Sequence, residues 1–398
     1  MDNSRDMYGF YQYKSLKTYS KYDVMMLADD PADVVWNFND DFFSGFDWKT
    51  EPEESIERLY EKRANHIRER YDYVILMLSG GSDSMNIFET FIRNNIKLDE
   101  VCYIVNVAGT NTRNSLLNRE IFDVAQPAVA RASQLYNITI KERMYDITSS
   151  TIEFYNNNPD FIHHLNNSGS PLTQAKPRGG SLIDTHVIEW INMVERGKRI
   201  CFLWGCDKPR VIGRGDKFSF YFSDIVDIVA PIKNQVHNIQ GEAVDELFYW
   251  SPTKESAYIL IKQAHIIKRI IINLKNCGKL KLIERINMVR NPFRTEYISS
   301  YQDPVSLKFY RINSCIIKNS IYPHHSIVSD LYSSKNNNNF LNERDSWFWK
   351  TNESILGGLE HHANTVKSGW VQDAYMMFND KKYIQKIKKL CSKEYPLQ

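Results

Sequence analysis

The chain lacks an excess of charge of either sign, a long apolar run and an N-terminal secretion signal. Its 50 Lys and Arg residues nearly balance 48 Asp and Glu residues, so the formal net charge is only +2 over 398 residues. A nucleic-acid partner usually requires a strong basic excess or a basic stripe, and the charge does not favour one here. No apolar run approaches the roughly 20 residues that span a membrane. We therefore expect no membrane association and, by default, a cytoplasmic location.

Paired cysteines are also missing. The six cysteines are scattered, and none belongs to a Cys-x-x-Cys pair. Cys102 and Cys201 fall in apolar runs that are typical of strands, which favours reduced, structural thiols over a zinc site or a disulfide framework. Sulfur-transfer chemistry that depends on paired cysteines is disfavoured for the same reason.

Hydrophobic patterning divides the chain into three parts. Residues 1–70 form an N-terminal region with aromatic clusters and a charged, amphipathic segment from about 54 to 70. From 71 to 235, short apolar runs alternate with helical segments, the pattern of β-α-β units around a parallel sheet. Residues 236–398 have mainly helical texture, clearest at 255–276. An α/β domain followed by a mainly helical C-terminal domain is therefore predicted.

The central part predicts a parallel sheet of about five strands with helices on both faces. The expected strands and the helices between them are, in order, 74–78, 84–94, 101–107, 114–136, 138–143, 182–195 and 199–204. The first strand is a continuous apolar run, which is typical of a strand buried on both faces. An aromatic run at 248–250 is predicted to be core, with a loop on the substrate side as the alternative.

A glycine-rich segment joins the first expected strand to the helix after it. It reads Ser79-Gly80-Gly81-Ser82-Asp83-Ser84. The glycines can adopt positive φ and bring backbone amides close to an anion, and the helix N-terminus adds N–H groups and a favourable dipole. The serines can donate hydrogen bonds, and Asp83 either caps the helix or offers a carboxylate to Mg²⁺. Gly, Ser and Asp that serve only turning and capping are the alternative.

Two common nucleotide-binding patterns are absent at this segment. No Lys follows the glycines, as a Walker loop requires, and the G-x-G-x-x-G pattern is missing. A strand, Ser-Gly-Gly-x-Asp-Ser and a helix instead resemble the PP-loop ATP pyrophosphatases, which include asparagine synthetase, GMP synthetase, argininosuccinate synthetase and tRNA-thiolating enzymes. In that family the loop binds the β- and γ-phosphates of ATP while the α-phosphate is attacked. The products are an adenylated substrate and pyrophosphate.

The resemblance implies a role for each residue of the segment. ATP and Mg²⁺ would be the ligands, and Asp83 would act in catalysis and hold the metal. The pyrophosphate-binding residues would be Ser79, Gly80, Gly81, Asp83 and Ser84, with Ser82 at the variable position. The family's fold also brings adenosine to the end of the second strand, at Asn106 and Val107, largely through backbone contacts.

A second stretch is similar to asparagine synthetase. A helix before a strand that ends in Gly205-Cys206-Asp207-Lys208 resembles the family's region with a Gly-x-Asp-Glu loop, which closes over pyrophosphate and magnesium. By this resemblance Gly205 lies at the nucleotide, Asp207 is a metal or phosphate partner, and Lys208 or Arg210 is a cation on the phosphates. Lys208 stands where the family commonly has Glu, and a plain surface turn is the alternative.

The predicted reaction is AMP-forming ligation, in which a substrate, expected to be a carboxylate, is adenylated and then attacked by an amine. A glutaminase like that of asparagine synthetases is not expected, because Asp2 follows the first methionine and Cys102 is the first cysteine. Two alternatives stay open: a PP-loop enzyme that modifies a nucleobase or tRNA, and a non-catalytic ATP-binding protein. The acceptor is an unidentified small molecule, and the patterns do not decide whether the chain forms a homo-oligomer.

Overall fold

The structure is a computed structural model of the chain. The residues described are 9–18, 24, 27–29, 33–105, 120–146, 188–205, 210–214, 216–222, 242–276, 320–323 and 392–398. Within these ranges no helix is long and apolar enough to cross a membrane.

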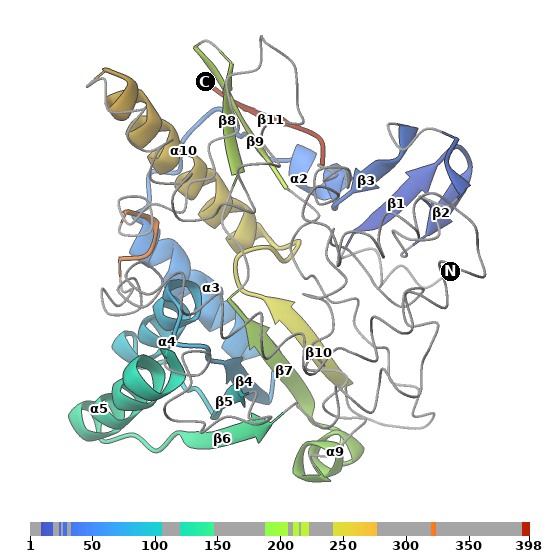
Figure 1. Cartoon of the computed structure of the whole chain (residues 1–398). Coiled ribbons are helices and arrows are strands. Elements are labelled where there is room, and N and C mark those ends of the chain that lie inside the picture. Colours follow the sequence, from blue (N-terminus) through green and yellow to red (C-terminus); the bar gives the residue numbers. More distant parts are fainter. Residues whose placement is uncertain are drawn as a thin grey trace, which may run out of the picture.

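A five-stranded parallel sheet lies at the centre of the described structure (Figure 1). From one edge to the other its strands are β10 (Glu242–Leu247), β7 (Arg199–Trp204), β4 (Tyr73–Met77), β5 (Glu100–Val105) and β6 (Lys141–Asp146). All neighbouring strands pair in parallel. The predicted α/β class with a five-stranded parallel sheet is therefore confirmed.

The strand order contains a topological switch point. The first strand in sequence, β4, is central, with β5 and then β6 added on one side and β7 and then β10 on the other. The chain therefore reverses its winding direction between β4 and β7. In open α/β sheets, ligands bind in the crevice outside the carboxyl ends of the strands at such a point.

Helices cover both faces of the sheet, as predicted. Val74 and Leu76 of β4 pack in a large core with the helices α3 (Ile56–Arg70), α4 (Ser82–Arg93) and α5 (Gln126–Tyr136). The alternate residues, Ile75 and Met77, pack on the other face with α9 (Ile188–Glu195). Because successive side chains of a strand point to opposite faces, the apolar run of β4 is buried on both sides.

Two smaller antiparallel sheets and further helices complete the described structure. One sheet contains β1 (Phe10–Tyr13), β2 (Leu16–Thr18) and β3 (Val35–Asn37), and the other contains β8 (Arg210–Arg214), β9 (Lys217–Tyr221) and β11 (Tyr395–Leu397). The remaining elements are α2 (Asp40–Ser44), the π-helix η3 (Ile121–Ala125) and the long helix α10 (Lys254–Asn276). Figure 1 shows α10 lying close to α3, against which it packs.

The part before residue 71 shares its core with the sheet. The same hydrophobic cluster contains Tyr11 of β1, Tyr60 of α3, Leu76 of β4 and Leu397 of β11. Trp48 stacks on Tyr395 with ring centroids 4.6 Å apart, which joins the N-terminal region to β11. The N-terminal region therefore helps to form the main core. The aromatic run at 248–250 is fully buried, as predicted.

Two strands of the parallel sheet differ from the sequence prediction. The third strand was expected at 138–143 and is β6 at Lys141–Asp146, because Asn137 ends α5 in a left-handed conformation and the chain needs several residues to reach the sheet. The fifth strand, β10, lies beyond residue 235, in the part predicted to be helical. Its sequence, EAVDEL, has too few apolar residues to be recognised as a buried strand. Helix α10 confirms the helical segment expected at 255–276, and most of the predicted C-terminal region lies outside the described residues.

Candidate active site at the carboxyl end of the sheet

The glycine-rich segment lies between β4 and α4, as the sequence predicted. The backbone N–H of Leu78 still donates to the carbonyl of Cys102 (3.0 Å), so the chain leaves the sheet only after this residue. Gly80 has a φ of +84°, and Gly81 is the extended N-cap residue of α4. The turn therefore directs the first amides of α4 toward the carboxyl end of the sheet, where the helix dipole favours an anion.

Gly80 is required for two independent reasons. Its positive φ is a conformation that residues with a side chain rarely adopt. A Cβ atom at this position would also overlap the backbone carbonyl of Glu120, which precedes η3. The turn and the start of η3 are therefore packed together so tightly that only glycine fits.

Two of the serines hold the turn in shape. The hydroxyl of Ser84 donates to the carbonyl of Gly81 (3.1 Å) and accepts from the backbone N–H of Ser79 (3.2 Å). Because its proton is used in this way, Ser79 is the donor in the 3.1 Å contact between the two hydroxyls. Ser79 also accepts from the backbone N–H of Gly81 (3.3 Å). In this conformation Ser79 and Ser84 close the loop on itself.

Ser82 differs from the other serines. Its residue is 3% exposed, and its hydroxyl has no hydrogen-bond partner among the residues that the structure describes. A buried hydroxyl left without a partner costs about 1–3 kcal/mol, so such a group is unusual in a folded protein. Ser82 therefore offers a free donor in the first turn of α4, although the resemblance assigned it to the variable position.

Asp83 is the only acidic residue of the segment and lies in the first turn of α4, partly exposed. Its backbone carbonyl accepts a hydrogen bond from the hydroxyl of Tyr249 (2.9 Å). Burial and the nearby Asp83 carboxylate raise the pKa of Tyr322, so this tyrosine stays protonated. The segment's single carboxylate thus lies beside buried phenols at the base of the helix.

Gly205, the first residue of the second predicted loop, lies at the same place. It follows β7, and a Cβ atom on it would lie 2.8 Å from the backbone nitrogen of Ser84 and 3.0 Å from its Cα. The chain leaving β7 therefore contacts the first turn of α4 directly. The ends of β4 and β7 flank the switch point, so the loop and Gly205 lie where an open α/β sheet binds ligands.

Glu120 is a site residue that sequence reasoning missed. Its carboxylate oxygen lies 3.8 Å from the position of a Cβ on Gly81, and its carbonyl packs against Gly80. The residue lies inside a segment that was expected to be an ordinary helix, and its type carries no signal. Only the fold brings this carboxylate to the loop.

Of the remaining predicted site residues, the structure describes only Arg210. Asn106, Val107, Asp207 and Lys208 lie outside the described residues. Arg210 opens β8 opposite Tyr221, and it is 9% exposed. A guanidinium buried to this extent needs anionic or carbonyl partners.

The described residues contain no group of three or more His, Cys, Asp or Glu side chains that could hold a metal by themselves. A Mg²⁺ ion that binds together with a nucleotide needs fewer ligands from the protein, because phosphate and water oxygens fill most of its coordination sphere. One or two carboxylates are enough, and Asp83 and Glu120 are both hard oxygen donors at the loop. The residues present therefore fit a nucleotide-bound Mg²⁺.

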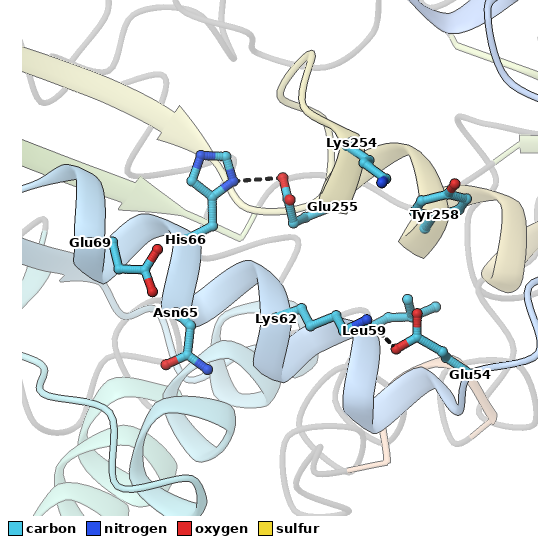
Figure 2. Close-up of a pocket in the computed structure, with 9 residues that line it drawn as sticks. All are labelled: Glu54, Leu59, Lys62, Asn65, His66, Glu69, Lys254, Glu255 and Tyr258. Atoms are coloured by element: carbon cyan, nitrogen blue, oxygen red, sulfur yellow. Dashed lines mark hydrogen bonds and ion pairs between the residues drawn. The ribbon is translucent and has the colours of Figure 1, made fainter.

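A second concave region lies between α3 and α10 (Figure 2). It is an open groove of about 660 Å³, and most of its lining residues are charged. Figure 2 shows two pairs in this groove: Lys62 with Glu54 at 2.5 Å, and His66 with Glu255 at 2.6 Å. The lining has three glutamates and only two lysines, so the groove offers little to an anionic ligand. The loop after β4 is therefore the stronger candidate.

The two described cysteines are structural. Cys102 and Cys201 are free and buried in the sheet. Burial raises the pKa of Cys102 to about 12 and raises that of Cys201 as well. Since the thiolate is the reactive form, neither residue is suited to nucleophilic or redox chemistry.

No protein-family model matches the chain, and a search of curated proteins finds no relative.

Proposed function

We propose that the chain is an ATP-using enzyme of the PP-loop type, which forms AMP and pyrophosphate. The observation that carries the proposal is the turn from β4 into α4, with Gly80 at a φ of +84° and Gly205 of the neighbouring strand end against the first turn of the helix. Its location at the switch point of a parallel sheet supports binding of a phosphate chain, and so does the α4 dipole.

Strand order gives further support. The sheet has its first strand in the centre and the loop directly after that strand, which is the arrangement that nucleotide-binding α/β folds share. Loop geometry alone is also compatible with turning and capping, since Ser79 and Ser84 bond within the loop. The unpartnered Ser82 hydroxyl favours the ligand-binding interpretation, because capping does not account for it.

The proposed reaction has two steps. A carboxylate oxygen of the acceptor attacks the α-phosphorus of ATP, the bond between that phosphorus and the bridging oxygen breaks, and an acyl adenylate and pyrophosphate form. An amine then attacks the acyl carbon and loses a proton, while the bond to AMP breaks and an amide results. The amides at the start of α4 and the Ser82 hydroxyl would stabilise the negative charge that grows on pyrophosphate.

Asp83 and Glu120 would hold Mg²⁺ on the phosphate chain. The ion, when bound, offsets phosphate charge and orients the leaving group. A bare phosphate chain beside two carboxylates would be repelled, so we expect the nucleotide to bind only as its magnesium complex.

The test is to incubate the purified chain with Mg-ATP labelled at the α-phosphate, with pools of carboxylic and amino acids plus ammonia, of nucleosides, or of RNA. AMP and pyrophosphate that appear with one pool would support the proposal and identify the acceptor class; RNA or nucleosides as that pool would indicate a nucleobase-modifying enzyme. Asp83→Ala should lose turnover, whereas Asp47→Ala, at an exposed position away from the loop, should not. ADP as the product would contradict the proposal, and binding without turnover would leave only an ATP-binding protein.

A further inference from the structure

Trp204 is the last residue of β7 and directly precedes Gly205, at the carboxyl end of the sheet. Its indole N–H donates to the carboxylate of Asp245 (2.6 Å) on β10, the strand that pairs with β7 (Figure 1). Asp245 is 1% exposed, whereas Trp204 is half-buried. A buried carboxylate therefore fixes the orientation of an indole ring that is partly exposed at the end of the sheet.

The amino end of the sheet contains the same pair of groups. The indole N–H of Trp190 in α9 donates to the carboxylate of Glu100 (3.3 Å), and both residues are 0% exposed. There the guanidinium carbon of Arg143 lies 4.9 Å from the centroid of the Trp190 ring. Arg143 also donates to Glu100 (2.5 Å). Within this molecule, an indole bonded to a buried carboxylate thus holds a cation on its face.

The ring of Trp204 has no such cation of its own. Among the residues that the structure describes, no Lys or Arg side chain lies over this ring and no aromatic ring packs against it. The buried indole at the amino end is therefore occupied by a cation from the chain itself. The half-buried indole at the carboxyl end instead offers its face to a ligand.

The hydrogen bond to Asp245 favours a cation as that ligand. The face of a tryptophan ring is negative, and it attracts cations more strongly than the rings of tyrosine or phenylalanine do. A carboxylate that accepts the indole proton places a negative charge beside the ring, which attracts a cation further. Stacking of a neutral planar ring needs no carboxylate. The pair therefore favours an ammonium group over the adenine base.

The Trp204 ring adjoins the loop after β4. Trp204 lies opposite Met77 of β4 in the sheet register, so it flanks the switch point. The next residue, Gly205, contacts the first turn of α4, because a Cβ atom on it would lie 2.8 Å from the backbone nitrogen of Ser84. A cation on the indole would therefore lie near any anion bound at the helix N-terminus, and the two charges would attract each other.

We propose that Trp204 and Asp245 form a subsite that binds an organic ammonium group on the face of the indole. Binding at this subsite does not depend on ATP chemistry. Its assignment to a substrate rests on the proposed function: the ammonium group belongs to the amine substrate of the second step. That substrate is an organic amine rather than ammonia, because a small, strongly hydrated ion gains less from an aromatic face.

The first test measures binding of two probes to the full chain by calorimetry, without nucleotide. The probes are choline and its uncharged isostere, an alcohol in which a carbon atom replaces the nitrogen. They have the same shape and differ in charge, so the wild type should bind choline about tenfold more tightly. Equal affinities would show apolar contact alone and would overturn the inference, as would a failure to bind choline.

Two variants locate the subsite. Trp204→Leu should weaken choline binding about tenfold. Asp245→Asn removes the charge and keeps the shape, so it should weaken choline binding and leave binding of the isostere unchanged. Trp190→Phe is the matched control, because its ring is fully buried and already holds Arg143; choline affinity should stay within about twofold. An equal loss in Trp190→Phe would overturn the inference. If Trp204→Leu does not fold, Asp245→Asn decides, and equal changes for both probes would overturn it.

Binding in the presence of Mg-ATP separates this subsite from the nucleotide site. Choline and Mg-ATP should bind together; if they exclude each other, the ring belongs to an adenine pocket and the inference fails. A chain that binds choline but not Mg-ATP would contradict the proposed function alone. In turnover, Trp204→Leu should raise the KM for the amine about tenfold and leave the KM for Mg-ATP unchanged. Ammonia as the preferred amine would overturn the assignment to the amine substrate.

Discussion

At the amino end of the parallel sheet, buried carboxylates are surrounded by donors. The loop at the carboxyl end instead combines a glycine at positive φ, short hydroxyl side chains and a buried hydroxyl that has no partner among the described residues. Glu100 at the start of β5 is 0% exposed and accepts from Arg143 (2.5 Å), Tyr73 (2.9 Å) and the indole of Trp190 (3.3 Å). Asp99, just before it, accepts from the backbone N–H of Val74 (2.9 Å). Such satisfied charges are what a stable structure requires.

The loop at the opposite end departs from that rule. Ser82 leaves a buried hydroxyl unsatisfied, and Gly80 adopts a conformation that limits the residue type to glycine. Unsatisfied polar groups are tolerated where a protein binds or reacts, because selection for function accepts their cost there. This difference supports the proposal that a ligand binds at the carboxyl end, while the amino end serves stability. Three substitutions test that division, and a fourth compares the loop with the groove between α3 and α10.

Gly80→Ala should have the largest effect on function. It forces a Cβ into the Glu120 carbonyl and an unfavourable φ on alanine, so the turn must move and the α4 amides with it. We expect Mg-ATP affinity to fall by on the order of 100-fold, the equivalent of about 2.8 kcal/mol. Calorimetric titration of Mg-ATP measures this loss.

Gly81→Ala is the matched control for this prediction. Gly81 has a φ of −69°, which alanine adopts readily, and its Cβ would meet only side-chain atoms, at 3.3 and 3.8 Å. It should lose much less affinity than Gly80→Ala. Equal losses would mean that removal of either glycine, and not the positive φ, is what matters.

Glu100→Gln should have the largest effect on stability among the remaining changes. The amide replaces one acceptor oxygen with a donor, although three donors converge on this carboxylate. We expect unfolding in urea to show a loss of about 2 kcal/mol, with Mg-ATP affinity unchanged. Glu189→Gln is the control, since Glu189 belongs to the same network but is 48% exposed, and it should lose far less. A loss of nucleotide binding in Glu100→Gln would break the proposed division.

The pH dependence of Asp99→Asn tests whether the amino end of the sheet contributes to stability. Burial opposes ionisation of Asp99, but hydrogen bonds from Lys97, the Val74 amide and Arg68 outweigh it and lower the pKa of the carboxyl group below 3.8. Its stabilising contribution is therefore complete above pH 3.8 and is lost as the pH falls through the lower, folded pKa. Asp99→Asn should cost about 1 kcal/mol at neutral pH, and the gap to the wild type should close in acid. Urea unfolding at a series of pH values measures this, and a gap that widened in acid would contradict it.

The parts of the fold that sequence reasoning predicted are those with a local signal. The apolar run of β4 predicts a central strand, and the glycines and serines after it predict a turn into a helix N-terminus. Strand β10 has no such signal, because Asp245 and Glu246 look exposed. Both are buried, since Arg63 of α3 pairs with Glu246 (2.8 Å) and the indole of Trp204 donates to Asp245 (2.6 Å).

The candidate site likewise contains residues that a local sequence signal predicts and residues that it does not. The loop residues are contiguous in sequence, so the sequence alone predicts that they lie together. Glu120 reaches the loop only because the chain folds back on itself, and its residue type is not unusual in its local context. The contact of Gly205 with α4 was foreseeable in outline, since carboxyl ends of neighbouring parallel strands meet at one edge of a sheet.

Lys62→Ala should have the smallest effect. Lys62 lines the groove between α3 and α10 and pairs with Glu54, but the two side chains are 47% and 40% exposed. Exposed ion pairs contribute little because water and salt screen them, so we expect a change of less than about 1 kcal/mol in urea unfolding, and less still at high salt. Mg-ATP affinity should be unchanged, because the groove has more carboxylates than lysines and does not favour an anion. If Lys62→Ala weakened nucleotide binding as Gly80→Ala is expected to do, the groove would replace the β4 loop as the phosphate site.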